Sequence, residues 1–373
     1  MEPNKNTSVF LRDTCKLGQV VKIQGGYSFQ SSAFTNRGIP IIRISNIDND
    51  QIDLKNSVVF YEEIRNLDEN FIAKDGDLLI AMSGATTGKA GVYKNTNLAY
   101  INQRVGKFVV TKSDKVIYKY LSYWVSSNHF TKQLSKYLAS GAQPNISPKN
   151  IEDMDIVLPD TKTQEKIIRT LDAISNNISN LEALVSKQES IKKTTLKMLL
   201  TPQSNWIHTN IGSLVTVLRG ESLQSKNFVS GNIPVVAGGV GIAGYHNKSN
   251  RPVNTITISA SGANAGFINF YKEPIFATDC STISETNSLD TLFLYYVLKS
   301  KQDSIFKMQT GGAQPHVHPK DISRINIFIP NLEEQQRIAT QLSEIDAHIG
   351  NLKEQLAKQR AIKQGLMDYF FGN

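Results

Sequence analysis

The fold is decided by the stretch Gly141-Ala-Gln-Pro-Asn-Ile-Ser-Pro-Lys-Asn-Ile151, because the chain repeats it as Gly312-Ala-Gln-Pro-His-Val-His-Pro-Lys-Asp-Ile322. The two copies are 171 residues apart, counted from Pro144 to Pro315. The match then continues without a gap for more than forty positions. Two long copies, rather than many short ones, predict duplicated domains within one chain and not a solenoid.

A weaker repeat links the beginnings of the two halves at an offset of 194 residues. It pairs Leu17-Gly-Gln-Val-Val-Lys-Ile23 with Ile211-Gly-Ser-Leu-Val-Thr-Val217. Between these segments, Ser83-Gly-Ala85 returns as Ser261-Gly-Ala263 at a smaller offset, so the second copy is the shorter one. The repeat divides the chain into a first globular domain at 1–158, a long helix at 159–201, a second globular domain at 202–329 and a second long helix at 330–373.

Each globular half mixes strand-like and helix-like segments. Residues 40–45 and 255–259 have the β-branched content of strands, and 77–82 reads as a buried strand. Residues 115–138 and 290–308 have the pattern of short helices. The expected fold class is therefore α+β, with two mixed α/β domains.

A long helix is predicted to follow a proline at the end of each half. In the first copy Asp160 or Thr161 is placed to cap the helix, and Thr161 with Gln164 fits a capping box. In the second copy Asn331 is the expected cap. Both helices therefore have a start signal encoded locally in the sequence.

Both helices carry an apolar seam with spacings of 4, 3, 4, 3 and 4 residues, which predicts a partner helix. A single amphipathic helix usually packs on its own domain. Two matched copies instead favour pairing the two helices antiparallel, as a coiled coil under a pseudo-two-fold axis. The seam consists of Ile167, Leu171, Ile174, Ile178, Leu181, Val185, Ile338, Leu342, Ile345, Ile349, Leu352 and Leu356.

Composition limits the class of protein. The net charge of +8 favours a polyanionic partner, although many basic proteins bind no nucleic acid. The chain has only Cys15 and Cys280, too few for a disulfide framework or a four-cysteine metal site. No apolar run approaches the ~20 residues of a membrane span. We expect a cytoplasmic protein with no membrane partner.

The motifs of common enzymes are incomplete. Residues 84–90 resemble a phosphate-binding loop, but three residues separate the glycines instead of four, and Ala90 stands where Ser or Thr should hold magnesium. His316 and His318 lack a third ligand for a metal, and exposed loop histidines are the simpler interpretation. We expect no catalytic residue and no metal site.

The order of these motifs, present twice, resembles the specificity subunits of type I restriction-modification systems across nearly the whole chain. The resemblance rests on Gly-Ala-Gln-Pro followed by an isoleucine, then Ile-x-x-Pro and a glutamine in the helix start, at residues 141–164 and 312–335. One departure is that the first helix opens Thr161-Lys-Thr163, where the second has Leu332-Glu-Glu334.

The resemblance implies a non-catalytic chain whose two target-recognition domains each read one half of a bipartite, asymmetric site on double-stranded DNA. The helices would space these domains and dock two modification subunits, which bind S-adenosylmethionine and methylate adenine. Restriction subunits would add ATP-driven translocation and cleavage. This chain would need no cofactor, since S-adenosylmethionine, ATP and magnesium belong to the partner subunits.

Polar loop residues are the candidate DNA contacts, because arginine suits guanine, asparagine or glutamine suits adenine, and lysine or hydroxyl groups suit phosphate. For any single one of them, an ordinary surface residue is the simpler interpretation. The two Ser-Gly-Ala turns are the better candidates, because glycine lets backbone amides approach a phosphate. The first-copy candidates are Lys22, Tyr27, Arg43, Asn46, Ser83, Thr86, Thr87, Lys89, Gln103, Arg104 and Gln143. The second-copy candidates are Arg219, Ser222, Gly239, His246, Lys248, Ser261, Asn264, Thr278, Gln314 and His316.

Two pairs of equivalent positions differ between the copies. Arg43 aligns with Ala237, and Lys89 aligns with Phe267. If these positions touch bases, the two half-sites cannot have the same sequence.

Two other classes of protein remain as alternatives. A nucleic-acid enzyme would need a cofactor motif that the sequence does not display. A coiled-coil adaptor with two protein-binding globules would explain the helices and the duplication, but not the basic charge. Binding that is insensitive to salt would favour the adaptor, since phosphate contacts weaken as salt rises.

Overall fold

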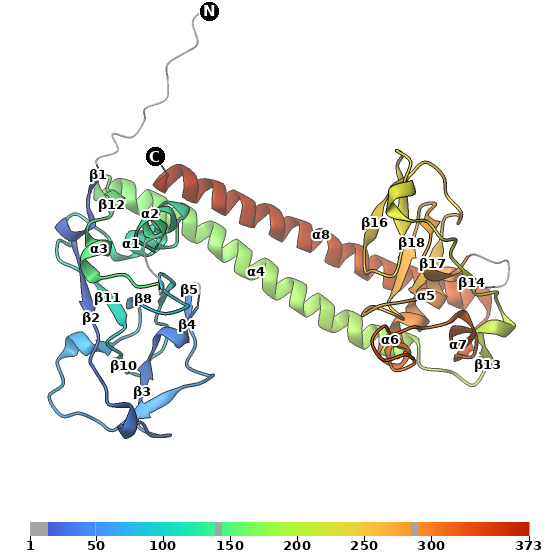
Figure 1. The fold of residues 1–373 in the computed structure, drawn as a ribbon, viewed down its shortest axis with the longest axis horizontal. Helices are drawn as coiled ribbons and strands as arrows, with labels where there is room; N and C mark the ends of the chain where they lie inside the picture. The colour runs from blue at the N-terminus through green and yellow to red at the C-terminus, as the bar shows by residue number, and fades with distance from the viewer. Residues whose placement is uncertain (1–13, 49, 139–143, 285–288, 373) are drawn as a thin grey trace, which may run out of the picture. The chain divides into compact units, whose positions relative to one another are not determined.

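The computed structural model describes residues 14–48, 50–138, 144–284 and 289–372. The chain packs as two compact units, the first made of Met1–Asn180 with Leu356–Asn373 and the second of Leu181–Gln355 (Figure 1). Each unit holds a mixed α/β body and part of both long helices. The fold class expected from the sequence is confirmed.

The body of the first unit contains a six-stranded sheet, a four-stranded sheet and a strand pair. Strand β8 (Leu78–Ala81) is buried along its whole length, as its unbroken apolar sequence predicts. The six-stranded sheet has the order β2 (Val21–Gly25), β11 (Val105–Val110), β8 (Leu78–Ala81), β9 (Ala90–Val92), β5 (Asp50–Ile52), β4 (Ile47–Asp48). The four-stranded sheet has the order β6 (Val59–Tyr61), β3 (Ile39–Ile42), β10 (Ala99–Ile101), β7 (Ile72–Ala73), and β1 (Thr14–Lys16) pairs with β12 (Asp155–Val157).

The body of the second unit repeats this topology. Its main sheet matches the first four strands of the six-stranded sheet, in the order β14 (Leu218–Arg219), β20 (Cys280–Ile283), β17 (Thr255–Ser259), β18 (Ile268–Tyr271). Strand β15 (Ile233–Val236) pairs parallel with β19 (Phe276–Ala277), as β3 does with β10. Strand β16 (Ile242–His246) completes that sheet, and β13 (Ile207–Asn210) pairs with β21 (Asn326–Ile329). The sequence repeat is therefore a repeat of structure.

Each body also contains short helices. They are α1 (Tyr118–Val125), α2 (Asn128–Leu138) and α3 (Pro148–Glu152) in the first unit, and α5 (Thr291–Ser300), α6 (Gln302–Phe306) and α7 (Pro319–Ser323) in the second. Of these, α1, α2, α5 and α6 lie in the ranges that the sequence predicted, and α3 and α7 do not. The strand expected at 40–45 ends earlier, because Ile44–Asn46 forms a 3-10 turn after β3.

The long helices are α4 (Thr161–Leu199) and α8 (Leu332–Phe371). Asp160 caps the first, accepting a hydrogen bond from the Thr163 backbone N–H at 3.0 Å, and Asn331 caps the second in the same way. The predicted capping box of Thr161 and Gln164 is wrong, because Thr161 is already helical and the Gln164 side chain bonds to the body of the unit.

The two helices run antiparallel where they meet within each unit. In the second unit Lys192 pairs with Asp346 at 2.5 Å and Glu189 with Lys353 at 2.6 Å. In the first unit Ile167 at the start of α4 lies in one core cluster with Phe371 at the end of α8. All twelve seam residues are buried or half-buried, a pattern that fits an antiparallel coiled coil. None of the helices in the described ranges is long and apolar enough to cross a membrane.

Candidate nucleic-acid interface

The repeated Ser-Gly-Ala segments form the same turn in both units. Ser83–Gly88 follows β8, and Ser261–Gly266 follows β17. Gly84 has a φ of +80° and Gly262 a φ of +78°, in the left-handed region that residues with a side chain rarely adopt. The turn therefore needs glycine at this position, which explains why both copies contain it.

The segment that begins at Pro144 in the first unit, and at Pro315 in the second, packs directly against this turn. The Gly84 N–H donates to the Pro144 carbonyl at 3.1 Å, and the Gly262 N–H donates to the Pro315 carbonyl at 3.0 Å. A further backbone hydrogen bond joins this segment to the residue before the turn. In the first unit the Ile146 N–H donates to the Met82 carbonyl. The Ser-Gly-Ala turn and the proline that ends the Gly-Ala-Gln-Pro motif therefore lie together in each unit, although they are about fifty to sixty residues apart in the chain.

A third loop joins this surface, between β10 and β11 in the first unit and between β19 and β20 in the second. The Met82 N–H donates to the Arg104 carbonyl at 2.9 Å, and the Ala260 N–H donates to the Asp279 carbonyl at 3.1 Å. Arg104 and Asp279 therefore occupy equivalent positions beside the two turns. Sequence analysis missed Asp279, because the first copy has one more residue in this loop and the shifted alignment hid the equivalence.

A glycine just after β2 in the first unit, and just after β14 in the second, packs closely against this loop. A Cβ at Gly26 would lie 2.2 Å from the Ile101 carbonyl oxygen, and one at Gly220 would lie 2.0 Å from the Thr278 carbonyl oxygen. Both contacts are with backbone, which cannot move aside cheaply. This close approach explains the second glycine shared by the two copies.

Most first-unit candidates lie at the surface, but their hydrogen bonds differ. Lys22, Tyr27, Gln103 and Arg104 are exposed, and Arg43, Ser83, Thr86, Thr87 and Lys89 are half-buried. Thr86 and Thr87 donate their hydroxyl protons to backbone carbonyls, and Lys89 forms an ion pair with Asp48 at 2.7 Å. The Arg43 guanidinium donates to the Ser57 carbonyl at 2.6 Å. Gln143, together with Gly141, lies outside the described residues.

Asn46 requires a correction. It is only 2% exposed, and its amide accepts from the Arg43 N–H at 3.0 Å and donates to the Asp53 carbonyl at 3.1 Å. Its polar atoms hold the turn after β3 together, so Asn46 cannot contact DNA directly in this structure. Its residue type suits adenine, but burial removes it from the surface.

The second-unit candidates divide similarly. Arg219, Ser222, Gly239, Lys248 and Gln314 are exposed, whereas Ser261, Asn264, Thr278 and His316 are half-buried. His246 requires a correction, since it is 8% exposed and its Nδ1 accepts from the Val229 N–H at 3.0 Å. The His316 and His318 rings stack with centroids 6.2 Å apart. In the described ranges no group of three or more His, Cys, Asp or Glu side chains could hold a metal ion.

The two turns differ in charge. Beside the first turn lies the exposed Arg104 guanidinium. Beside the second, the Ser261 hydroxyl donates to the Asp279 carboxylate. Burial, followed by the neighbouring charge of Asp279, raises the pKa of Cys280 to about 12, so this thiol stays protonated and is not a nucleophile near neutral pH.

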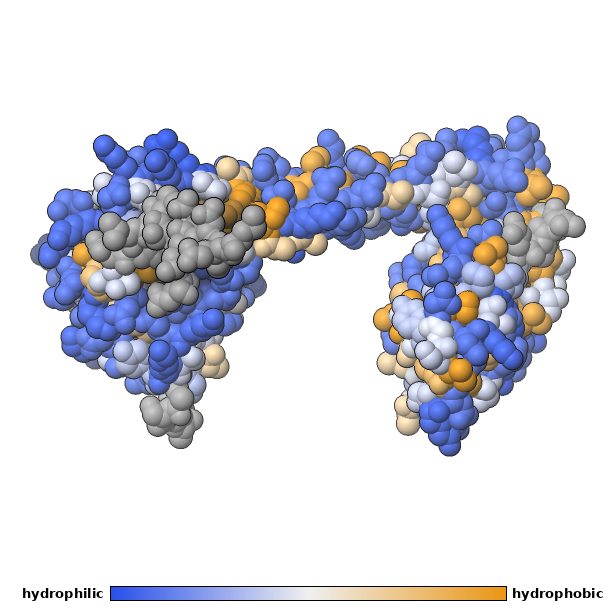
Figure 2. Space-filling view, turned by 90° about the horizontal axis from the view of Figure 1, so that it is seen from above, coloured by the Kyte–Doolittle hydropathy of each residue, from blue (hydrophilic) through white to orange (hydrophobic). Residues whose placement is uncertain are grey.

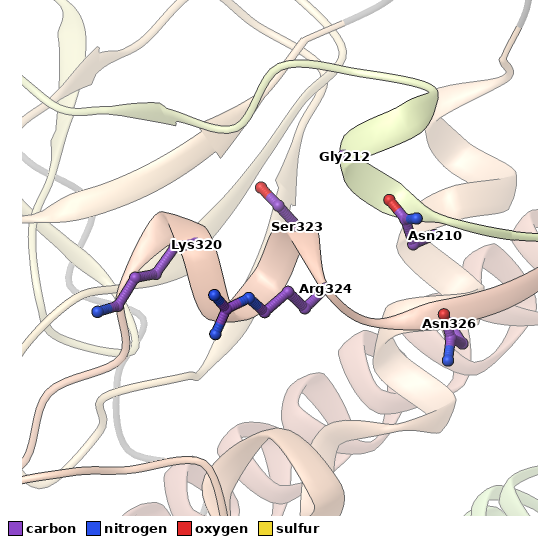
Figure 3. A pocket seen from close by; sticks show the side chains of 6 residues that line it. All are labelled: Asn210, Gly212, Lys320, Ser323, Arg324 and Asn326. Atoms are coloured by element: carbon purple, nitrogen blue, oxygen red, sulfur yellow. The ribbon is translucent and has the colours of Figure 1, made fainter.

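A shallow pocket in the second unit adds a basic patch (Figure 3). Lys320 and Arg324 line it, and Figure 3 shows Lys320 extending away from the ribbon of α7 while Arg324 lies along that helix. The residues 171 positions earlier, Lys149 and Asp153, form an ion pair with each other at 2.7 Å. Among the described residues no carboxylate lies within salt-bridge distance of Lys320 or Arg324. The second unit therefore has two cations where the first has a neutral pair.

Two equivalent α/β bodies, each presenting one turn on a fixed backbone with different outward side chains, define a duplicated recognition protein. The chain belongs to the family of the type I restriction modification DNA specificity domain, whose model matches residues 13–192 and 203–359. The two matched ranges correspond to the two copies of the repeat.

Relatives and solved structures agree with this assignment. The chain is 31% identical over 193 residues to the type I restriction enzyme MjaVIII specificity subunit of Methanocaldococcus jannaschii, covering 51% of this chain and 45% of that protein. It is 26% identical over 188 residues to the EcoAI specificity subunit of Escherichia coli, covering 49% of this chain and 31% of that protein. The chain therefore spans less than half the length of these relatives.

The fold is similar to the crystal structure of the type I restriction-modification system S subunit from M. genitalium. The TM-score is 0.72 at 16% identity, over 100% of this chain and 98% of that chain. At this identity the likeness concerns the fold alone. It extends over both units, which agrees with the duplication seen in the sequence.

Proposed function

We propose that this chain is the non-catalytic DNA-reading subunit of a type I restriction-modification complex, with each unit reading one half of a bipartite, asymmetric site. The observation that carries the proposal is the shared surface of turn, loop and strand end in each unit. Its backbone is the same in both units, but the side chains it presents are not. Arg104 in the first unit corresponds to Asp279 in the second, and Lys89 corresponds to Phe267.

The shared backbone suits the sequence-independent part of DNA binding. Backbone amides in glycine turns can approach phosphates closely, and these contacts fix the position of the protein on the duplex. The side chains that differ between the units suit base reading in the major groove, where each base pair presents its own pattern of donors and acceptors. Different side chains on equal backbones imply two different half-sites.

The long helices supply a surface for the modification subunits. Each unit has an apolar flank beside the seam, formed by Leu184, Ile191 and Met198 in the second unit and by Ile362 and Tyr369 in the first. These residues are 40–70% exposed and seven residues apart along each helix. Figure 2 shows hydrophobic residues interrupting the hydrophilic surface of the long helices.

A two-helix coiled coil needs only the narrow apolar seam. The flank makes the apolar face of each helix wider, as in helices that pack against several neighbours in a bundle. Ile191 and Ile362 occupy the same position in the two copies, as do Met198 and Tyr369. Two equivalent flanks fit two partner subunits, each contributing amphipathic helices. We assign S-adenosylmethionine and adenine methylation to these partners, and ATP, magnesium and cleavage to restriction subunits, all acting in the cytoplasm.

The proposal is tested by co-expressing the chain with its modification subunit and sequencing the methylated adenines of the host. We expect one bipartite motif with two different halves, and its loss when the chain is deleted. A stable complex without any methylation motif would contradict DNA reading. Failure to form a complex would contradict docking and favour the adaptor.

A further inference from the structure

The equivalence of Arg104 and Asp279 has a consequence for the bases that the second unit reads. The backbone carbonyl oxygen of each residue accepts a hydrogen bond from the N–H of the residue before its turn, Met82 or Ala260, so the two side chains leave the backbone at equivalent places. Arginine at such a position suits guanine, whose O6 and N7 are both acceptors. A carboxylate cannot replace it, because it only accepts hydrogen bonds.

The Asp279 carboxylate is held in a fixed place at the surface. Its Oδ2 accepts from the Ser261 hydroxyl, and a Cβ at Gly238 would lie 2.8 Å from the same oxygen. The glycine therefore lets the loop after β15 close over one side of the carboxylate. Among the described residues no donor is bonded to Oδ1, which leaves one oxygen as an acceptor at the half-exposed edge.

The loop after β15 also carries exposed apolar residues. The loop after β15 is anchored by the Ser259 hydroxyl, which donates to the Gly239 carbonyl at 3.2 Å, and by the Asn269 amide, which donates to the Val240 carbonyl at 2.9 Å. This anchoring leaves Val240 52% exposed and Ile242 46% exposed. Exposed apolar side chains on this loop would exclude water from an interface formed there and strengthen the hydrogen bonds within it.

We propose that Asp279 is a specificity-determining residue that accepts a hydrogen bond from the N4 amino group of a cytosine in the half-site read by the second unit. This inference rests on the proposed function. A carboxylate close to DNA is repelled by phosphates, so its presence there is stabilised only by a base that donates to it.

Cytosine fits this acceptor better than the other bases. Guanine presents N7 and O6 and thymine presents O4 in the major groove, and all of these are acceptors that repel a carboxylate. Adenine presents a donor at N6 but an acceptor at N7 beside it. Cytosine presents the N4 donor without a neighbouring acceptor on the same base. The first unit, with Arg104 at the equivalent position, should read guanine.

The test compares the methylation motif of the whole complex for the wild-type chain and Asp279→Asn. Asparagine keeps an acceptor for the Ser261 hydroxyl and adds a donor, so it can pair with adenine N6 and N7. We expect one cytosine of one half-site to become adenine or degenerate, and binding to the original duplex to weaken by about 10- to 100-fold. Asp279→Glu should retain the cytosine with weaker binding.

Matched variants separate base reading from a structural role. Asp303→Asn removes an exposed carboxylate of the same unit on α6 and should leave the motif unchanged. Arg104→Gln should alter one base pair of the other half-site only. Thermal melting of each variant checks that the second unit is folded.

The results have distinct meanings. A wild-type half-site without cytosine, or an unchanged motif with folded Asp279→Asn, overturns the inference and leaves the proposed function standing. A wild-type complex that produces no motif overturns the proposed function itself. A single-position change confined to one half-site supports both.

Discussion

At the scale of single residues, Gln164 and Gln335 connect the body of each unit to its long helix. Gln164 is fully buried, and its side chain accepts from the Ile117 N–H at 2.9 Å and donates to the Lys115 and Pro159 carbonyls, each at 2.7 Å. Gln335 accepts from the Asp290 N–H and donates to the Pro330 carbonyl, both at 3.0 Å. The repeat therefore keeps this glutamine for a buried hydrogen-bond network.

Replacing Gln335 tests this role. Gln335→Leu leaves the Asp290 N–H and the Pro330 carbonyl without their partner in the interior, and we expect the free energy of unfolding to fall by about 1–3 kcal/mol. Urea unfolding followed by circular dichroism measures the change. Gln336→Leu is the matched control, because Gln336 is the next residue in the chain and its side chain is exposed. Equal losses in the two variants would contradict a specific role for Gln335.

Single residues also show where sequence reasoning about the site succeeded and failed. Arg104 was selected for its chemistry, and it lies exposed beside the turn. Asn46 and His246 were selected on the same grounds, but backbone groups around them occupy their polar atoms in the interior. Residue type predicts what a side chain can bind, whereas burial decides whether it can reach a ligand.

At the scale of elements, the long helices were the most predictable part of the fold. The seam spacing, the capping Asp160 and Asn331, and the prolines before them are all local signals. The apolar flank was not predicted, because a seam is recognised by its period and the flank adds only one residue per heptad. Exposure in the folded pair is what distinguishes the flank from the seam.

Charging the flank tests docking. Ile191→Glu and Ile362→Glu together place a carboxylate on the apolar flank of each unit, where a partner helix would have to bury it. We expect loss of the complex with the modification subunit in size-exclusion chromatography, with the melting temperature of the isolated chain little changed, since both side chains are already 40–49% exposed.

The control places the same charges on another face of the same helices. Ser186→Glu and Ala357→Glu are exposed positions that do not belong to the flank. This double variant should keep the complex intact. A complex that survives the flank substitutions as well would rule out docking at this surface.

At the scale of the whole molecule, the net charge of +8 and the exposed cations Lys320 and Arg324 of the second unit predict binding that depends strongly on salt. Neutralising Lys320 and Arg324 together with Lys320→Met and Arg324→Met should weaken binding to all duplexes alike. If each cation contacts a phosphate, the slope of log K against log salt should become shallower by about 2. Fluorescence anisotropy of the assembled complex at several salt concentrations measures this slope.

Lys149→Met is the internal comparison for that experiment. Its ammonium group is already paired with Asp153, so its removal should change the slope less. A slope that is flat for the wild-type complex would instead favour the adaptor class.

The sequence by itself determined the duplication, the two long helices with their seam, and the mixed α/β character of each half. These properties depend on periodicity and on capping and strand signals within a few residues, which fold in the same way wherever the segment packs. The tertiary structure alone decided that the turn after β8, the segment beginning at Pro144 and the β10–β11 loop share one surface, and that Asp279 occupies the position equivalent to Arg104. Strand pairing between distant segments brings those residues together, and no local pattern in the chain encodes which strands become neighbours.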